Sequence, residues 1–162
     1  MIRIEMENGD IIEIELDPTA APKTCANFEK LVKEGFYDGL TFHRVIPGFM
    51  IQGGDPQGTG MGGSKETIVG EFAANGHPNP LKHTRGVISM ARTMMPNSAS
   101  SQFFIMHKDS PHLDAQYAGF GKVIEGLEVI DLIANVKTGR LGWYDDVPKT
   151  PVVIEKIEVI EA

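Results

Sequence analysis

One stretch of the sequence, residues 42–55 (FHRVIPGFMIQGGD), combines residue types that could act on a mostly apolar substrate. Arg44 is its only full positive charge, and apolar residues and a glutamine follow. In an extended strand, Arg44, Met50 and Gln52 share one face only if the Pro47-Gly48 bend keeps the register. A guanidinium beside an apolar cup suits a substrate with one hydrogen-bond acceptor. The alternative is a surface arginine on an ordinary strand with a bend.

Other motifs that resemble enzyme signatures lack the context those signatures need. Residues 58–63 fit the G-x-G-x-x-G pattern, but no buried strand precedes them and no acidic residue lies about 20 positions on. We therefore favour a surface loop over a dinucleotide site. The histidines form no H-E-x-x-H pattern, and no G-x-S-x-G pattern surrounds Ser98, Ser100 or Ser101. The sequence thus predicts no metal site, no cofactor and no hydrolase nucleophile.

Composition bounds the remaining possibilities. With 162 residues, 41% of them hydrophobic, the chain fits one domain over residues 1–162 with a proper core. The formal net charge of −7 argues against nucleic acid and anionic membranes as partners. A single cysteine, Cys25, rules out an internal disulfide and suits a reducing cytosol. No signal-peptide pattern, membrane-spanning run or interface signal is visible, so we expect a cytoplasmic monomer.

The first seventeen residues predict a β-hairpin, because isoleucines alternate with charged residues on both sides of a turn. A two-residue Asn8-Gly9 turn would set Ile4 opposite Glu13 and split the apolar face. A three-residue loop over residues 8–10 sets Ile4 opposite Ile14 and keeps the apolar residues together. We therefore expect the second register, with a left-handed residue at or next to Gly9.

Hydrophobic spacing places the other elements. A helix is predicted from Pro22 to just before Gly35, with Cys25 on its buried stripe, and a shorter helix over residues 126–134. Residues 53–86 read as mostly loop. Short strands are expected within residues 36–52 and at 68–72, 87–91, 102–106, 117–123 and 152–160, the last with a bulge. Core packing is favoured over an exposed rim for Met90, Met94, Met95 and Met106.

Six runs of sequence, taken together, indicate a family. They are GFYDGLTFHRVIPGFMIQGGD at 35–55, GTG at 58–60, GVISMA at 86–91, SQFFI at 101–105, LD at 113–114 and FGKV at 120–123. In this order they resemble the cyclophilins, which are peptidyl-prolyl cis-trans isomerases. The resemblance implies a mainly β fold, a closed eight-stranded antiparallel barrel capped by two α-helices, with the active groove on its outer surface. It implies no metal and no cofactor.

The resemblance also carries roles over to residues of this chain. Arg44 matches the family's catalytic arginine. Eleven further positions match the walls of the proline pocket, the polar groups beside it and the segment that hydrogen-bonds the peptide backbone: Phe49, Met50, Gln52, Ala91, Arg92, Thr93, Gln102, Phe104, His112, Leu113 and Tyr117.

The chain departs from the best-known members of the family at three places. His112 stands where they have tryptophan, Tyr117 stands where they have histidine, and residues 92–95 replace a shorter turn. These departures bear on sequence preference and inhibitor binding more than on the reaction. We therefore expect weakened affinity for cyclosporin-type inhibitors.

The implied activity is rotation about X-Pro bonds in proline-containing peptides and in folding or folded protein clients, without a covalent intermediate. The alternative is a non-catalytic chaperone or scaffold module that binds proline peptides in the same groove. A pure binder would tolerate the loss of Arg44, so its presence beside the pocket residues favours the enzyme. The interpretation as a nucleotide-dependent oxidoreductase depends only on the glycine-rich residues 58–63, and we do not favour it.

Overall fold

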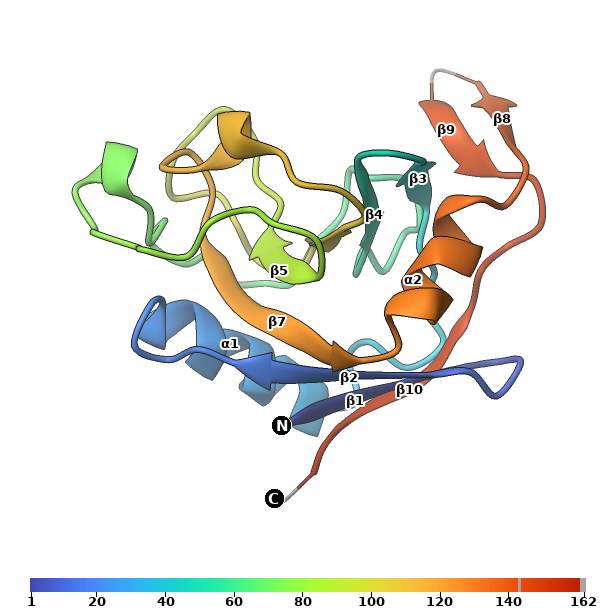
Figure 1. Ribbon diagram of the computed structural model, residues 1–162, viewed down its shortest axis with the longest axis horizontal. Coiled ribbons are helices and arrows are strands. Elements are labelled where there is room, and N and C mark those ends of the chain that lie inside the picture. Colours follow the sequence, from blue (N-terminus) through green and yellow to red (C-terminus); the bar gives the residue numbers. More distant parts are fainter. Residues whose placement is uncertain (143, 161–162) are drawn as a thin grey trace.

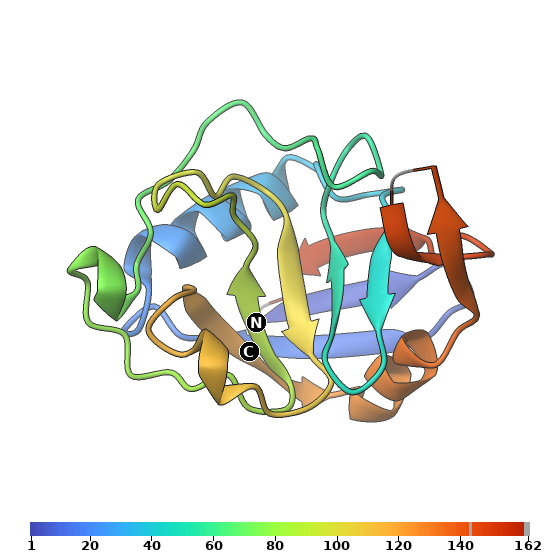
Figure 2. The ribbon, with the colours of Figure 1, turned by 90° about the horizontal axis from the view of Figure 1, so that it is seen from above.

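Eight strands form one antiparallel sheet (Figure 1). The computed structural model describes residues 1–142 and 144–160. The strands are β1 (Ile2–Met6), β2 (Ile11–Leu16), β3 (Arg44–Ile46), β4 (Met50–Gly53), β5 (Val87–Met90), β6 (Phe103–Met106), β7 (Gly119–Glu125) and β10 (Ile154–Val159). Their order in the sheet is β10-β1-β2-β7-β5-β6-β4-β3. Figure 2 shows β5, β6, β4 and β3 side by side.

The two edges of the sheet meet. Thr41, before β3, forms an antiparallel bridge with Val153, before β10. The Phe42 N–H donates to the Val152 carbonyl at 3.0 Å, and the Ile154 N–H donates to the Leu40 carbonyl at 2.8 Å. These bonds close the sheet on itself, so the predicted eight-stranded antiparallel barrel is confirmed.

Two α-helices cover different parts of the barrel, α1 (Pro22–Lys33) and α2 (Leu127–Ala134) (Figures 1 and 2). The helix α1 begins at Pro22, as predicted, and Gly35 follows its end with a left-handed φ of +72°. The ring of Phe28, on α1, packs against three aromatic rings of the barrel core: those of Tyr37, Phe103 and Phe120. Cys25 is 3% exposed, which confirms it as a core residue, and burial raises the pKa of its thiol to about 12. Among the described helices, none has the length and hydrophobicity to cross a membrane.

The first turn of α1 is capped from another part of the chain. Its N-cap residue, Ala21, has no side-chain acceptor to offer. The buried Glu71 carboxylate takes over, because its Oε1 accepts both the Thr24 N–H, at 2.6 Å, and the Thr24 hydroxyl, at 2.7 Å. A carboxylate at this end also complements the helix dipole. The segment before residue 72 is thereby fixed to the helix.

The predicted register of the first hairpin is wrong by two residues. Ile4 lies opposite Ile12 and not Ile14, so the loop is Glu7-Asn8-Gly9. The apolar face survives, because a shift of two preserves parity. The Asn8 side chain explains the choice, since its Oδ1 accepts the Asp10 N–H at 2.9 Å and so fixes the turn one residue earlier. Gly9 is left-handed, at φ +94°, as predicted.

Residues 68–72 are not the strand that the sequence predicted. The Gly70 N–H donates to the Asn97 side chain at 3.0 Å, and the Gly70 carbonyl accepts from Asn75 at 2.9 Å. Because side chains satisfy both backbone groups of Gly70, this residue does not join a ladder. A short 3₁₀ helix, η1 (Ala73–Asn75), follows. No sequence pattern predicted the second hairpin, which is formed by β8 (Thr138–Leu141) and β9 (Tyr144–Pro148).

The bulge predicted near the C-terminus is present. Glu5 of β1 pairs with Lys156 of β10, and Met6 pairs with Ile154, so Glu155 is the extra residue.

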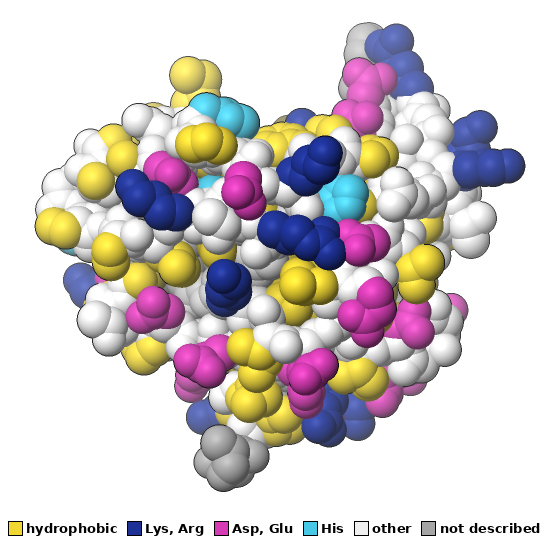
Figure 3. All heavy atoms as spheres, in the orientation of Figure 1, with side chains coloured by type: hydrophobic (Ala, Val, Ile, Leu, Met, Phe, Trp, Pro, Cys, Tyr) yellow, Lys and Arg dark blue, Asp and Glu magenta, His cyan; other side chains and the backbone are white. Residues whose placement is uncertain are grey.

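Acidic and basic side chains are interspersed on the surface, as Figure 3 shows for one face. Arg85 and Asp131 form a bidentate pair at 2.6 and 2.9 Å, which ties the loop before β5 to α2.

The cap on α1 gives a test of stability. Glu71→Ala should lower the free energy of unfolding by about 1.5–3 kcal/mol, because two buried bonds to a charged acceptor are lost. Urea unfolding measures the change. Glu66→Ala is the matched control, since this exposed carboxylate also contacts α1, at 3.8 Å from Lys30. The control should change stability by less than about 0.5 kcal/mol. Equal effects would show that Glu71 is not a cap.

Candidate active site

The β3–β4 hairpin carries the first of the predicted site residues. Arg44 pairs with Gln52 and Ile46 pairs with Met50, so the bend between the strands keeps the register. Gly48 in this bend has a left-handed φ of +78°, which suits glycine. Arg44, Met50 and Gln52 therefore share one face, as the alternation predicted.

A small apolar cluster lies on the outer face of the sheet, apart from the barrel core. β4 pairs with β6 so that Gln52 lies opposite Phe104. Met50 and Phe104 are buried there together with Leu113, which comes from a 3₁₀ helix, η2 (Pro111–Leu113). The Tyr117 ring meets Phe104 edge-on, with centroids 5.7 Å apart. The cluster gives the outer face an apolar floor.

Above this floor lies a hollow of about 140 Å³. It brings together nine of the twelve predicted site residues: Arg44, Phe49, Met50, Gln52, Ala91, Arg92, Phe104, Leu113 and Tyr117. A five-membered proline ring is the kind of small apolar group that such a hollow suits. These residues come from β3, β4, β6, η2 and three loops, so only the folded chain brings them together.

A row of glutamines runs along one side of the hollow. Gln52 Nε2 donates to Gln102 Oε1 at 2.9 Å, and Arg44 Nη1 donates to Gln52 Oε1 at 3.3 Å. Gln102 in turn donates to the carbonyls of Gly60 and Gly62, at 3.0 and 2.8 Å. Each amide is therefore oriented by its neighbour, and the last acceptor in the row faces the guanidinium.

The glycine loop that mimics a dinucleotide motif holds this row in place. The Asp55 carboxylate accepts backbone N–H groups from Gln57, Thr59, Gly60 and Gly62 at 2.6–3.1 Å. Burial raises the pKa of Asp55, but these hydrogen bonds outweigh it and lower the pKa overall. The loop is thus wrapped around a carboxylate, and its carbonyls point to Gln102.

Arg92 forms a wall of the hollow. Its guanidinium lies 4.7 Å from the ring centroids of both Phe72 and Tyr117. Arg92 Nε and Nη2 also donate to the Gln116 carbonyl, at 3.1 and 2.6 Å. These contacts fix Tyr117, which is one of the positions where the chain departs from the best-known relatives.

Three predicted residues lie outside the hollow but beside it. Thr93 and Gln102 line a second hollow of about 270 Å³, which shares Gln52, Ala91 and Arg92 with the first. His112 is exposed on η2, with its ring centroid 5.9 Å from that of Phe49. Core packing, predicted for four methionines, is confirmed for Met90 and Met106, which are buried. It is wrong for Met94 and Met95, which are 95% and 69% exposed.

Comparison with known proteins decides the family. A family model described as cyclophilin type peptidyl-prolyl cis-trans isomerase/CLD matches residues 1–159. The chain belongs to the cyclophilins. Peptidyl-prolyl cis-trans isomerase B of Bacillus subtilis is 53% identical to this cyclophilin over 130 residues, covering 80% of this chain and 87% of that protein. Peptidyl-prolyl cis-trans isomerase B of Escherichia coli is 41% identical over 169 residues, covering 99% and 100%.

A solved structure agrees with these relatives. A Cryptosporidium parvum cyclophilin, crystallised in the presence of the dipeptide Ala-Pro, superposes with a TM-score of 0.88 at 35% identity, covering 99% of both chains. This cyclophilin is accordingly a peptidyl-prolyl cis-trans isomerase, and the activity predicted from the resemblance is confirmed.

Sequence reasoning missed a buried polar network behind the hollow of this cyclophilin. His83 stacks on Phe104, with centroids 6.1 Å apart, while its Nε2 lies 2.9 Å from Ser89 Oγ and its Nδ1 lies 3.0 Å from Asp114 Oδ1. The order resembles a hydrolase triad, but Ser89 is fully buried and no substrate reaches it. The network supports the floor. In the sequence, the one signal that could have indicated this network is Ser89, a polar residue inside an otherwise apolar strand.

This network predicts a pH dependence of folding. Burial lowers the pKa of His83, and Asp114 only partly offsets the effect. The unfolded chain therefore binds more protons below a pH of about 6.5, and stability should fall as the pH falls through this range. His83→Gln, which is less stable overall, should show a flatter decline between pH 7 and pH 5 in urea unfolding. Parallel curves for the two proteins would contradict the prediction.

Proposed function

We propose that Arg44 is the catalytic residue of this cyclophilin and that the hollow beside it holds the proline ring. One observation carries the proposal: an exposed guanidinium stands at the rim of an apolar hollow and is oriented by the glutamine row. Among the ion pairs between described residues, none involves Arg44, so its remaining donors can turn to a substrate.

The reaction needs a group that recognises a twisted amide. Rotation about an X-Pro bond crosses a barrier of ~18–20 kcal/mol, because the planar amide has partial double-bond character. In the twisted transition state this resonance is lost and the proline nitrogen regains a basic lone pair. A donor aimed at that nitrogen binds the transition state more tightly than the ground state, which is the requirement for catalysis.

The surroundings of Arg44 suit that task. Arginine keeps its charge at every physiological pH and offers several donors in a rigid fork. Phe104 and Met50, both nearly fully buried, form an apolar floor that excludes water from one side of the ring. Water stabilises the charge-separated planar amide, so its exclusion favours rotation. The chemistry proceeds through non-covalent contacts alone.

The substrates that we propose are proline-containing peptides and exposed protein segments. The second hollow adjoins the first through Gln52, Ala91 and Arg92, so a residue flanking the proline can occupy it. The Ala-Pro dipeptide used with the Cryptosporidium parvum relative is consistent with this class of ligand. Thr93 and Gln102 are then contacts for the flanking residue.

Replacing Arg44 tests the catalytic role. Arg44→Ala should lower kcat, and kcat/KM with it, by 10²–10³, because a charged hydrogen bond made in the transition state is worth about 3–4 kcal/mol. Arg44→Lys should recover only part of the rate, since an ammonium lacks the fork. A protease-coupled assay on an Ala-Pro peptide measures the rates.

The melting temperature of each Arg44 variant should stay close to that of the wild type, because the side chain is exposed. Arg3→Ala, on β1 and away from the hollow, is the matched control and should keep the wild-type rate. A well-folded Arg44→Ala protein with near wild-type kcat would show that this arginine is not the catalyst.

His112 should limit the affinity for cyclosporin. Its exposed ring beside Phe49 offers less contact than an indole, and its donor pattern depends on tautomer and pH. His112→Trp should tighten binding by ~1–3 kcal/mol, the scale of one hydrogen bond plus added contact. His112→Phe separates the two contributions, because phenylalanine adds a ring without a donor. Titration calorimetry gives the affinities, and equal values for all three proteins would remove His112 as the cause.

A further inference from the structure

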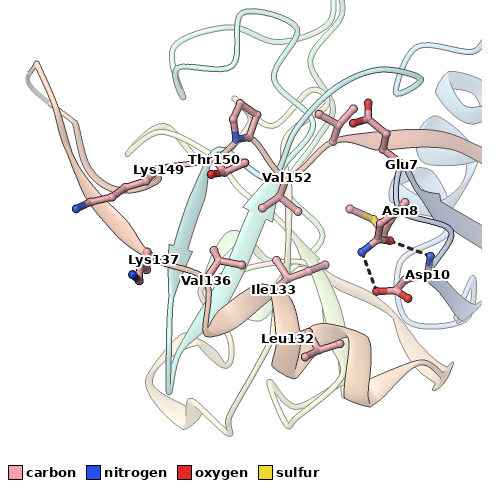
Figure 4. A pocket seen from close by; sticks show the side chains of 13 residues that line it. Glu7, Asn8, Asp10, Leu132, Ile133, Val136, Lys137, Lys149, Thr150 and Val152 are labelled. Carbon is pink, nitrogen blue, oxygen red and sulfur yellow. Dashed lines mark hydrogen bonds between the residues drawn. The ribbon is translucent and has the colours of Figure 1, made fainter.

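A second groove, of about 580 Å³, shares no lining residue with the proline hollow (Figure 4). Three parts of the chain form it: the β1–β2 turn, the C-terminal end of α2 and the segment that leads from β9 into β10. Its volume lies within the range of pockets that bind ligands. Neither the isomerase reaction nor the glutamine row makes use of it.

The middle of this groove is apolar. Met6 and Ile133 line it and are buried. Val136 and Val152 lie beside Ile133 and are partly exposed (Figure 4). Leu132 on the wall is 63% exposed, although it lies on a helix whose neighbouring side chains pack into the barrel. Covering these side chains would remove apolar surface from water.

The two ends of the groove carry opposite charges. Figure 4 shows Glu7 and Asp10 at one end and Lys137 and Lys149 at the other, with the apolar side chains between them. None of these four residues takes part in an ion pair with another residue of the described chain. The charges are thus available to an external partner.

Backbone and side-chain bonds hold the groove open in one shape. The Lys149 N–H donates to the Lys137 carbonyl at 2.9 Å, which sets the two lysines side by side. The Glu7 N–H donates to the Val153 carbonyl at 3.0 Å, and Asn8 clamps Asp10 within the turn. A preformed site loses little entropy when it binds a ligand.

We propose that this groove binds an extended, mostly apolar peptide segment of a partner protein, with a basic side chain at the Glu7–Asp10 end and an acidic one at the Lys137–Lys149 end. The charge pattern selects such a segment over a uniformly charged one. A second copy of this chain fits less well, because each copy has a net charge of −7 and the two repel. The segment needs no proline, so a client can be held here while its prolines reach the active hollow.

The test uses a proline-free hexapeptide, acetyl-Arg-Ala-Leu-Val-Ala-Asp-amide, titrated into the ¹⁵N-labelled 162-residue protein. Amide signals of residues 6–10, 132–137, 149–150 and 152–153 should shift together, while those of Arg44, Gln52 and Phe104 stay in place. Binding should weaken with added salt, because the end charges are exposed. If no signal shifts at millimolar peptide, or if only the active-site signals shift, the proposal is overturned.

Charge reversal tests the assignment of the ends. The double variant Lys137→Glu/Lys149→Glu should bind the hexapeptide about tenfold more weakly, a change of about 1.4 kcal/mol. The same variant should bind acetyl-Arg-Ala-Leu-Val-Ala-Arg-amide more tightly than the wild type does, which a merely structural role of the lysines would not produce. Its isomerase rate on an Ala-Pro peptide should equal that of the wild type and serves as the check on folding.

Two exposed leucines give a matched pair for the apolar part. Leu132→Gln should weaken binding, whereas Leu141→Gln, at a side chain 66% exposed outside the groove, should not. Equal effects would contradict a specific site. Sedimentation of the wild type as a dimer that the double variant loses would assign the face to a second copy and overturn the peptide proposal.

Discussion

The antiparallel pairing of β4 with β6 is the constraint on which the candidate active site depends. It sets Gln52 opposite Phe104 on the outer face, and Ile51 opposite Ile105 on the inner face, where both isoleucines are fully buried. Because side chains alternate along a strand, the same pairing supplies the barrel core and the floor of the hollow beside Arg44. A slip of one residue would exchange the two faces, so core packing also protects the site.

A series of hydrogen bonds that starts at Asp55 orients the guanidinium of Arg44. The Asp55 carboxylate gathers the backbone N–H groups of the glycine loop, the carbonyls of that loop orient Gln102, and Gln102 orients Gln52 beside Arg44. A side chain on an exposed strand is thereby held without a salt bridge, which would have occupied its donors. The apolar floor has its own support in the buried imidazole of His83.

Alternation and helical spacing predicted the elements that bury one face, and the family runs predicted the barrel and which residues would gather at the hollow. Errors arose where side chains decide the backbone. The Asn8 side chain moved the first turn by one residue, and Asn97 kept Gly70 out of a strand. The cap on Thr24 and the bond between His83 and Asp114 join residues far apart in sequence, so local patterns could not pair them.

Closure of the barrel also determines when this protein can fold during its own synthesis. The N-terminal strand β1 lies between β2 and β10, and its residue Ile2 pairs with Val159 near the other end of the chain. Until β10 has been synthesised, one edge of β1 has no native partner, and such an edge can pair with other chains. Pairing over so long a separation is slow to form. This isomerase therefore completes its own barrel only after β10 leaves the ribosome.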